Sequence, residues 1–337
     1  MANKKKIVIL GLGLAGSIMQ AVLSTWEKEI LNEICIIGDS KYWDHKALFR
    51  FQNADLGALL GIDLIEIIVY KAIYYRGKVY TESNILFSNL YSLKTVEALI
   101  IKSIKDLTPR MRWLPKTRGH FRESRINRGW IKVLPGRVSQ VGLGWVSYEA
   151  EDCKGKGEID CDTIISTLPM EFVVNCLGLD LDERIKFKSS PIFIYRADFE
   201  PEFNELCQTI YFPDLEFPVY RASIDFKEII IEAIRECKEE ELLEVLGAFG
   251  LSKIHLPGKG TFDCFIQKYG KIKPLQDEVR QTLLYKLTTD YNIYSLGRFA
   301  LWKNLKADEI LQDAQKIKKY IESPVLSQKY FSRRGGV

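Results

Sequence analysis

The sequence has few of the residues that build metal sites and cross-linked frameworks. Its 337 residues include three histidines, none in an H-E-x-x-H or H-x-x-H spacing, and seven cysteines, none in a C-x-x-C pair. This scarcity argues against a metalloenzyme, a structural zinc site and a disulfide-stabilised fold. Scattered, unpaired cysteines are typical of buried thiols in a reducing compartment, which predicts a cytoplasmic protein.

Long apolar runs are also missing. No stretch approaches the roughly 18 apolar residues that a membrane-spanning helix needs, since even the most apolar segment, 62–72, contains Asp63 and Glu66. The N-terminal lysines lead into a short apolar strand and glycines rather than into a signal-peptide cleavage site. We therefore expect a soluble globular chain, large enough for two joined domains, with no membrane partner; its oligomeric state is left open.

Positive charge is concentrated in one window of a chain whose net charge is only +4. Residues 102–137 contain eleven lysines and arginines against two acids, Asp106 and Glu123, and three aromatic side chains, Trp113, Phe121 and Trp130, lie among them. Such a window fits an anionic partner, which could be a phosphorylated substrate, a nucleotide or a nucleic acid. The alternative is a solvated face whose charges pair with acids elsewhere.

The opening segment combines an apolar strand, a glycine-rich turn and the start of a helix. Residues 6–10 form the strand, and Gly11, Gly13 and Gly16 follow as a G-x-G-x-x-G motif. Gly11 permits a tight turn, Gly13 lets the backbone approach a pyrophosphate, and Gly16 lets the helix pack closely on the strand. The motif predicts a dinucleotide-binding unit and leaves open whether the nucleotide is NAD or FAD.

A second apolar strand, residues 33–38, ends in Asp39, which lies 23 residues beyond Gly16. An acid at this point accepts hydrogen bonds from the adenosine ribose in dinucleotide folds. The following residues mix aromatic and basic side chains as in a loop, and His45 lies among them. Apolar residues at helical spacing then predict a helix over 96–104.

Later segments predict a return to the first sheet and a second, antiparallel sheet. A strand over 159–166 stops at a small-residue turn containing Thr167, and a strand over 291–296 ends in Gly297-Arg298 before a helix from about Ala307 to 321. Between them, residues 192–197, 209–212 and 219–224 have the pattern of antiparallel strands.

Three of these segments, in this order, match one known pattern: the G-x-G-x-x-G opening, the strand ending at Thr167, and Gly297-Arg298 with its aromatic and basic continuation. Together they resemble the FAD-dependent amine oxidase and protoporphyrinogen oxidase superfamily, nearest to its compact branch, the UDP-galactopyranose mutases. The resemblance implies an α/β fold in which a Rossmann-type FAD-binding domain carries an inserted α+β substrate domain with an antiparallel sheet. The implied FAD domain comprises residues 1–60, 132–175 and 288–325, the substrate domain residues 61–131 and 176–287, and a flexible tail residues 326–337.

The resemblance also implies roles for particular residues. Asp39 would bind the FAD ribose, Val138 the adenine through its backbone, and Thr167 the adenosine side. The helix that begins near Ala307 would point its N-terminus at the flavin pyrimidine. The pyrophosphate would lie against Gly11, Gly13, Leu14, Ala15, Gly16, Gly297 and Arg298.

Two departures from the family pattern bear on the activity. The loop after Asp39 lacks the family's Gly-Gly pair, and Asn304 stands where the mutases usually have an aromatic residue. We therefore expect a flavin-facing loop that differs from the usual one, and the second departure argues against galactofuranose formation.

The leading hypothesis is an FAD-dependent oxidoreductase or flavin-dependent isomerase that acts on an anionic, nucleotide- or nucleic-acid-linked substrate. The flavin would take up a hydride or act through its N5 as a nucleophile. Candidate catalytic residues near the flavin are His45, Trp302 and Lys303, and candidate substrate-binding residues are Arg196, Tyr211, Tyr220 and Arg221, with core packing as the alternative for the two tyrosines.

Two other functions stay open at this point. One keeps the fold and replaces the cofactor, giving an NAD(P)-dependent dehydrogenase. The other is a nucleic-acid-associated protein, or a flavoenzyme that modifies a base within nucleic acid, which would use the basic window 102–137.

Overall fold

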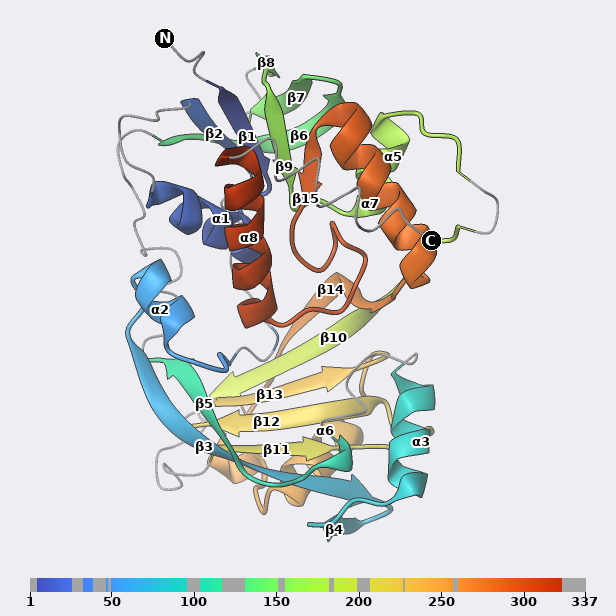
Figure 1. Ribbon diagram of the computed structural model, residues 1–337. Helices are drawn as coiled ribbons and strands as arrows, with labels where there is room; N and C mark the ends of the chain where they lie inside the picture. Colours follow the sequence, from blue (N-terminus) through green and yellow to red (C-terminus); the bar gives the residue numbers. More distant parts are fainter. Residues whose placement is uncertain are drawn as a thin grey trace.

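A computed structural model describes residues 5–25, 33–38, 47, 50–95, 104–116, 131–150, 155–181, 185–198, 207–226, 228–256 and 260–322. It has two large sheets with helices packed on them, and it is a mixed α/β fold (Figure 1).

The first sheet is built mainly from parallel strands. Its order is β15 (Ile293–Ser295), β9 (Thr163–Ser166), β1 (Lys6–Leu10), β2 (Glu33–Gly38), β6 (Ile131–Gly142), β7 (Trp145–Ala150) and β8 (Lys156–Asp160). The strands from β15 to β6 are parallel, and β6, β7 and β8 form an antiparallel meander. The strand, turn and helix predicted at the start of the chain are therefore present as β1 and α1 (Leu14–Ser24) at the centre of a parallel sheet.

Alternate residues of β1 enter two different cores. Ile7 and Ile9 pack with α1 and α8 (Ala307–Glu322) on one face, and Val8 and Leu10 pack against α5 (Met170–Cys176), α7 (Asp277–Tyr291) and the meander on the other. Burial on both faces explains why the strand is apolar at every position from residue 7 to residue 10.

The second sheet has the order β14 (Asp263–Lys273), β10 (Lys188–Asp198), β13 (Glu228–Ala233), β12 (Val219–Asp225), β11 (Cys207–Tyr211), β3 (Leu64–Tyr75) and β4 (Lys78–Tyr80), and β5 (Arg110–Pro115) also pairs with β3. Its strands pair antiparallel except for β11 and β3, which are parallel. The sheet is therefore mixed, although the strands predicted within 192–224 do belong to its antiparallel part.

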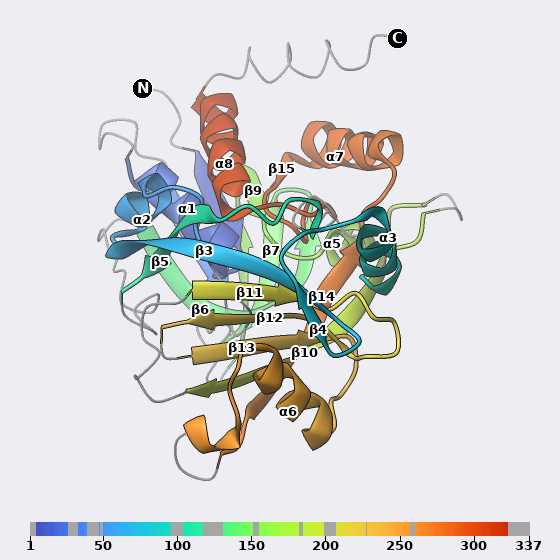
Figure 2. The same ribbon diagram turned by 90° about the horizontal axis from the view of Figure 1, so that it is seen from below.

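Helices cover the two faces of the second sheet differently. On one face, α6 (Glu239–Ala248) packs over Ile210 and Ile231, on the side away from the first sheet in Figure 2. On the other face, α3 (Ile85–Lys94) packs over Tyr211 and Ile194. The short α2 (Asp55–Leu60) joins the α1 side of the first sheet. Most of the helix predicted over 96–104 lies outside the described residues, and the described helix of this region, α3, comes before it.

Candidate functional site

The glycine turn after β1 is fixed by contacts that only glycine permits. The Gly11 amide donates to the Ile37 carbonyl at 2.7 Å, and its φ of +97° lies in the left-handed region. A Cβ on Gly11 would stand 2.2 Å from the Thr167 hydroxyl oxygen, and one on Gly16 would stand 2.0 Å from the Gly11 carbonyl oxygen. The turn and the close packing of α1 on β1 therefore require both glycines.

Gly13 differs from these two because it faces open space. A Cβ placed there meets no described atom within 4 Å. Gly13 is the N-cap of α1, no side chain caps the helix, and its first turn contains no acid. The first backbone amides of α1, those of Leu14 to Gly16, have no acceptor within the helix and lie next to this open position. Free amides at a helix N-terminus are the arrangement that binds phosphate groups.

Two later segments meet this turn. The Thr167 hydroxyl donates to the Leu10 carbonyl at 2.7 Å, and the Leu296 amide donates to the Ser166 carbonyl at 2.9 Å. A Cβ on Gly297 would stand 2.7 Å from the Ala15 Cβ. The structure thus brings together, at one end of the first sheet, the three segments on which the predicted resemblance depends.

The structure gives fewer contacts with the glycine turn for the other predicted cofactor residues. Val138 lies on β6 at a β-bulge and is buried with the meander, and Ala307 begins α8 as predicted. Asp39 and the candidate catalytic residue His45 lie outside the described residues. The described end of β2 does adjoin the turn, because a Cβ on Gly38 would stand 2.5 Å from the Leu12 amide nitrogen. All of these cofactor roles remain predictions.

Arg298 leaves the glycine turn and reaches the second sheet. Its guanidinium donates to the Gly270 carbonyl of β14 at 2.7 Å, and its Nε is buried without a hydrogen-bond partner among the described residues. In Figure 1 the loop after β15 descends toward β14. The hydrogen bond from Arg298 to Gly270 therefore links the first sheet to the second, and its predicted contact with the pyrophosphate stays a prediction.

Around Arg298 lies a group of buried side chains that we call the charge cluster. It consists of Tyr91, Tyr211, Tyr220, Arg221, Glu232, Lys271 and Arg298. Arg221 forms an ion pair with Glu232 across β12 and β13. The Lys271 ammonium lies 3.8 Å from the centre of the Tyr220 ring, and the Tyr91 and Tyr211 rings meet edge to face at 5.5 Å.

The cluster perturbs the acidity of its members. Burial raises the pKa of Glu232, but Arg221 and a hydrogen bond from Tyr220 oppose burial and hold the pKa below its ordinary value. Burial lowers the pKa of Lys271 to about 7, and the nearby Arg221 and Arg298 act in the same direction. The cluster is therefore a low-dielectric site in which one carboxylate faces three basic groups.

The sequence predicted four of these residues, Tyr211, Tyr220, Arg221 and Arg298, and missed Tyr91, Glu232 and Lys271. The predicted substrate residue Arg196 lies on the same face of the second sheet, where it forms an ion pair with Glu228. Of the candidates near the flavin, Trp302 has no exposed surface and packs against Phe187 at 5.1 Å, and Lys303 follows it in a partly exposed turn. Trp302 thus has the surroundings of a core residue, and a catalytic role for either residue is untested.

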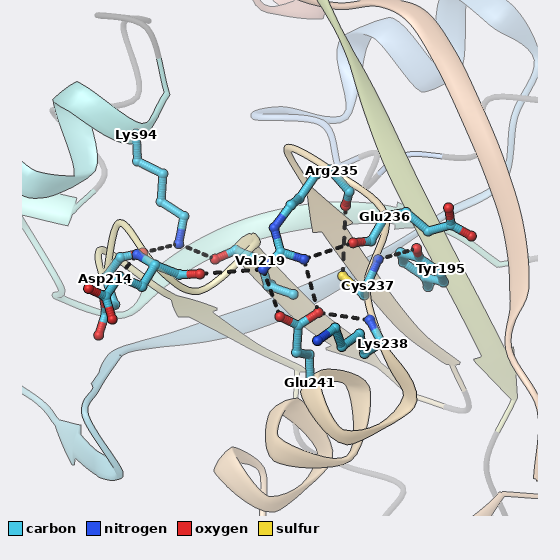
Figure 3. A network of polar contacts seen from close by, with 10 residues as sticks. Lys94, Tyr195, Asp214, Val219, Arg235, Glu236, Cys237, Lys238 and Glu241 are labelled. Carbon is cyan, nitrogen blue, oxygen red and sulfur yellow. Dashed lines mark hydrogen bonds and ion pairs between the residues drawn. The ribbon is translucent and has the colours of Figure 1, made fainter.

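Lys94 anchors the helix that carries Tyr91. It follows Tyr91 by three residues, and its buried ammonium donates to the carbonyls of Phe212, Asp214 and Val219 at 2.8, 2.5 and 2.6 Å. Figure 3 shows the contacts with Asp214 and Val219. Three donors therefore meet three acceptors, and the end of α3 is tied to the connection between β11 and β12.

We expect Lys94→Met to lower the free energy of unfolding by about 3 kcal/mol, because three backbone carbonyls would lose their donor in a largely buried place. Denaturant unfolding of the full chain measures the change. The matched control is Lys286→Met, which removes an exposed helical lysine on α7. Equal stability of the two variants would contradict the anchoring role.

Comparisons with known proteins give a result at the level of structure. No known protein family and no curated protein matches the sequence. Among solved structures, reduced UDP-galactopyranose mutase superposes with a TM-score of 0.68 at 14% identity, over 96% of this chain and 95% of that one. The chain has the fold of UDP-galactopyranose mutase. The predicted superfamily resemblance is thereby confirmed for the fold.

Other solved structures share the fold at similarly low sequence identity. A fatty acid isomerase from P. acnes gives a TM-score of 0.62 at 11% identity, covering 94% of this chain and 98% of that one. BrvH, a flavin-dependent halogenase from Brevundimonas sp. BAL3, gives 0.52 at 10% identity, covering 94% and 72%. Proteins with this fold thus include a mutase, an isomerase and a halogenase, so the fold alone does not select a reaction.

Two kinds of structural feature are absent from the described residues. None of the described helices is both long and apolar enough to span a membrane. No group of three or more histidine, cysteine or acidic side chains in the described part of the chain is arranged to hold a metal ion.

Proposed function

We propose that the chain is an FAD-dependent enzyme, an oxidoreductase or isomerase, that acts on an anionic substrate bound at the charge cluster. The observation that carries the proposal is the turn at Gly13. No described side chain caps this helix N-terminus, no described atom lies within 4 Å of a Cβ placed on Gly13, and Thr167 and Gly297 border the turn. In dinucleotide-binding α/β folds, the turn between the first strand and the first helix is the position of the glycine fingerprint that binds the pyrophosphate.

A second observation also fits a bound flavin dinucleotide. Four polar atoms of the segment from Arg298 to Asp308 are buried without a hydrogen-bond partner among the described residues: Arg298 Nε, Trp302 Nε1, Asn304 Nδ2 and Asp308 Oδ1. Buried polar atoms are normally paired, so unpaired ones in the segment that follows Gly297 suit a bound polar molecule. Asn304, which departs from the mutase pattern, is one of the four.

Each part of the site would then have a distinct task. A bound flavin supplies hydride transfer or covalent chemistry that the side chains of this chain lack. Gly13 and the first amides of α1 would hold the pyrophosphate, while Arg298 and Lys271 would attract the anionic group of the substrate. Tyr91 and Tyr220 would exclude water from it, since both are almost fully buried. A nucleotide is one source of such an anion.

An NAD(P)-dependent dehydrogenase is less well supported than a flavoenzyme. The glycine turn alone suits both cofactors, whereas the convergence of Thr167 and Gly297 on it matches a pattern of flavoenzymes, and a flavin-dependent halogenase shares the fold. The comparisons give no support to nucleic-acid modification, and residues 117–130 of the basic window lie outside the described residues. We therefore do not propose a nucleic-acid function.

Cofactor titration tests the proposal. We expect the full chain, freed of any bound cofactor, to bind FAD with quenching of flavin fluorescence and to bind FMN at least about a hundredfold more weakly, since FMN lacks the adenosine half that the first sheet would hold. NADH and NADPH should not displace the FAD. Protection from proteolysis by NADPH but not by FAD would instead establish the dehydrogenase alternative.

A further inference from the structure

Lys271 and Arg298 are the two basic residues of the charge cluster that form no ion pair with a described acid. Lys271 lies on β14 opposite Ser190, it is 7% exposed, and its ammonium sits over the Tyr220 ring. No described residue forms a hydrogen bond or ion pair with it. A cation–π contact alone is a weak substitute for a counter-ion beside a largely buried ammonium.

The groups that face Lys271 come from three other segments. Tyr220 and Arg221 approach from β12, Glu232 from β13, and Arg298 from the loop after β15. Glu232 already receives the Arg221 guanidinium and the Tyr220 hydroxyl. Glu232, the one carboxylate of the cluster, forms its ion pair with Arg221 and also attracts Lys271 and Arg298, so three basic groups share a single acid.

This imbalance has a physical consequence for ligand binding. Two unbalanced basic groups in a buried place are stabilised by an anion, and an anion placed between them favours the protonated form of Lys271. Burial, Arg221 and Arg298 hold the pKa of Lys271 at about 7 in the free protein. Above neutral pH the free protein therefore contains mostly the neutral amine, and an arriving anion must be accompanied by a proton.

We propose that Lys271 binds the anionic group of the substrate and that anion binding there takes up one proton from solvent onto the Lys271 amine. The inference rests on the proposed function for the location of the substrate. The ligand is an oxyanion, such as a phosphate, sulfate or carboxylate group. No bond other than the new N–H bond forms, and the buffer supplies the proton.

Isothermal titration with sulfate tests the inference, because sulfate keeps its charge between about pH 6 and about pH 8. In FAD-saturated full-length protein, sulfate affinity should be about tenfold lower at about pH 8 than at about pH 6, which is the ratio of protonated Lys271 at these two values. Heats measured in buffers of different ionisation enthalpy should show proton uptake of nearly one per sulfate at the higher pH.

Three variants make the result specific. Lys271→Arg keeps a cation at both pH values, so its sulfate affinity should not change with pH, and no proton should be taken up. Lys271→Met should bind sulfate at about pH 6 at least about tenfold more weakly than the wild type. Lys268→Met removes an exposed lysine of the same strand that also lies over an aromatic ring, Tyr269, and should behave like the wild type.

The opposite results would overturn the inference. They are a wild-type sulfate affinity that is equal at both pH values, or a Lys271→Met variant that binds sulfate as the wild type does. The FAD content of each protein is read separately from its absorbance. A protein that binds FAD but shows no Lys271-dependent anion binding loses only this inference, whereas Lys271-dependent binding by a protein that takes up no FAD removes the proposed function.

Discussion

Replacing Gly13 with glutamate is expected to abolish FAD binding while leaving the fold intact. A Cβ at this position meets no described atom within 4 Å, so a side chain can leave the backbone here without a clash at its first carbon. Its carboxylate would occupy the space in front of the α1 amides and would repel a pyrophosphate. We expect FAD affinity to fall at least about a hundredfold, which corresponds to about 3 kcal/mol.

A control glycine separates this effect from general damage. Gly247 of α6 also has no described atom within 4 Å of a Cβ, and it lies far from the glycine turn, so Gly247→Glu should bind FAD as the wild type does. By contrast, Gly16→Ala would press a methyl group against the Gly11 backbone and should lower stability itself. FAD titration and thermal unfolding distinguish the three variants. Unchanged FAD affinity in Gly13→Glu would show that the cofactor does not bind at this turn.

The second large effect is expected from breaking the Arg221–Glu232 ion pair. The side chain of Glu232 is 2% exposed and that of Arg221 is 22% exposed. Removing one partner of a buried pair leaves an uncompensated charge and costs about 3–5 kcal/mol. Arg221→Met should lower the stability more than Glu232→Leu does, because it leaves the more deeply buried charged group, Glu232, without its ion-pair partner.

A double-mutant cycle tests this account of the pair. The variant carrying both Arg221→Met and Glu232→Leu should be more stable than the sum of the two single losses predicts, by at least about 1 kcal/mol. The loss of folding stability in Arg221→Met should also become smaller as the pH falls. Burial raises the pKa of a Glu232 that has lost its ion-pair partner, and the protonated, neutral acid does not carry the cost of a buried charge.

The exposed Arg235–Glu241 pair, shown in Figure 3, serves as the reference for the cycle. Its arginine side chain is 50% exposed, so Arg235→Met should cost about 1 kcal/mol or less. If the stability losses of Arg221→Met and Glu232→Leu simply added up in the double variant, as they do at two independent surface positions, the result would contradict coupling between Arg221 and Glu232.

The sequence was most informative where local chemistry sets the structure. Gly16 is required by a contact with Gly11, five residues earlier, and the uniformly apolar sequence of β1 follows from burial on both faces. Thr167 and Gly297 were found only through the order of three short motifs. Their side-by-side position depends on β9 and β15 being neighbours in a parallel sheet, which no local pattern specifies.

The charge cluster was harder to predict because sheet register assembles it. Glu232 and Lys271 lie on β13 and β14, which are not among the strands predicted from the sequence, and only the pairing of β12 with β13 brings Arg221 to Glu232. Tyr220 and Arg221 are adjacent in sequence, so strict alternation would place them on opposite faces. A β-bulge between Val219 and Arg221 relaxes this alternation, and both side chains enter the cluster.

Tyr91 was missed for a different reason. Its helix, α3, exposes Ile85, Leu86 and Leu93 on one side and buries Phe87 and Tyr91 on the other. Because apolar residues lie on both sides of this helix, its hydrophobic periodicity is weak, and the sequence does not indicate which face is buried.

The most direct test of the central claim is identification of the cofactor that the purified full-length protein carries. Its absorbance spectrum is recorded, the protein is denatured, and the released small molecules are identified by mass spectrometry. Our account predicts visible flavin absorption and FAD, close to one per chain after reconstitution with excess FAD. A colourless protein that gains no flavin on reconstitution and is stabilised by NAD(P) would contradict it.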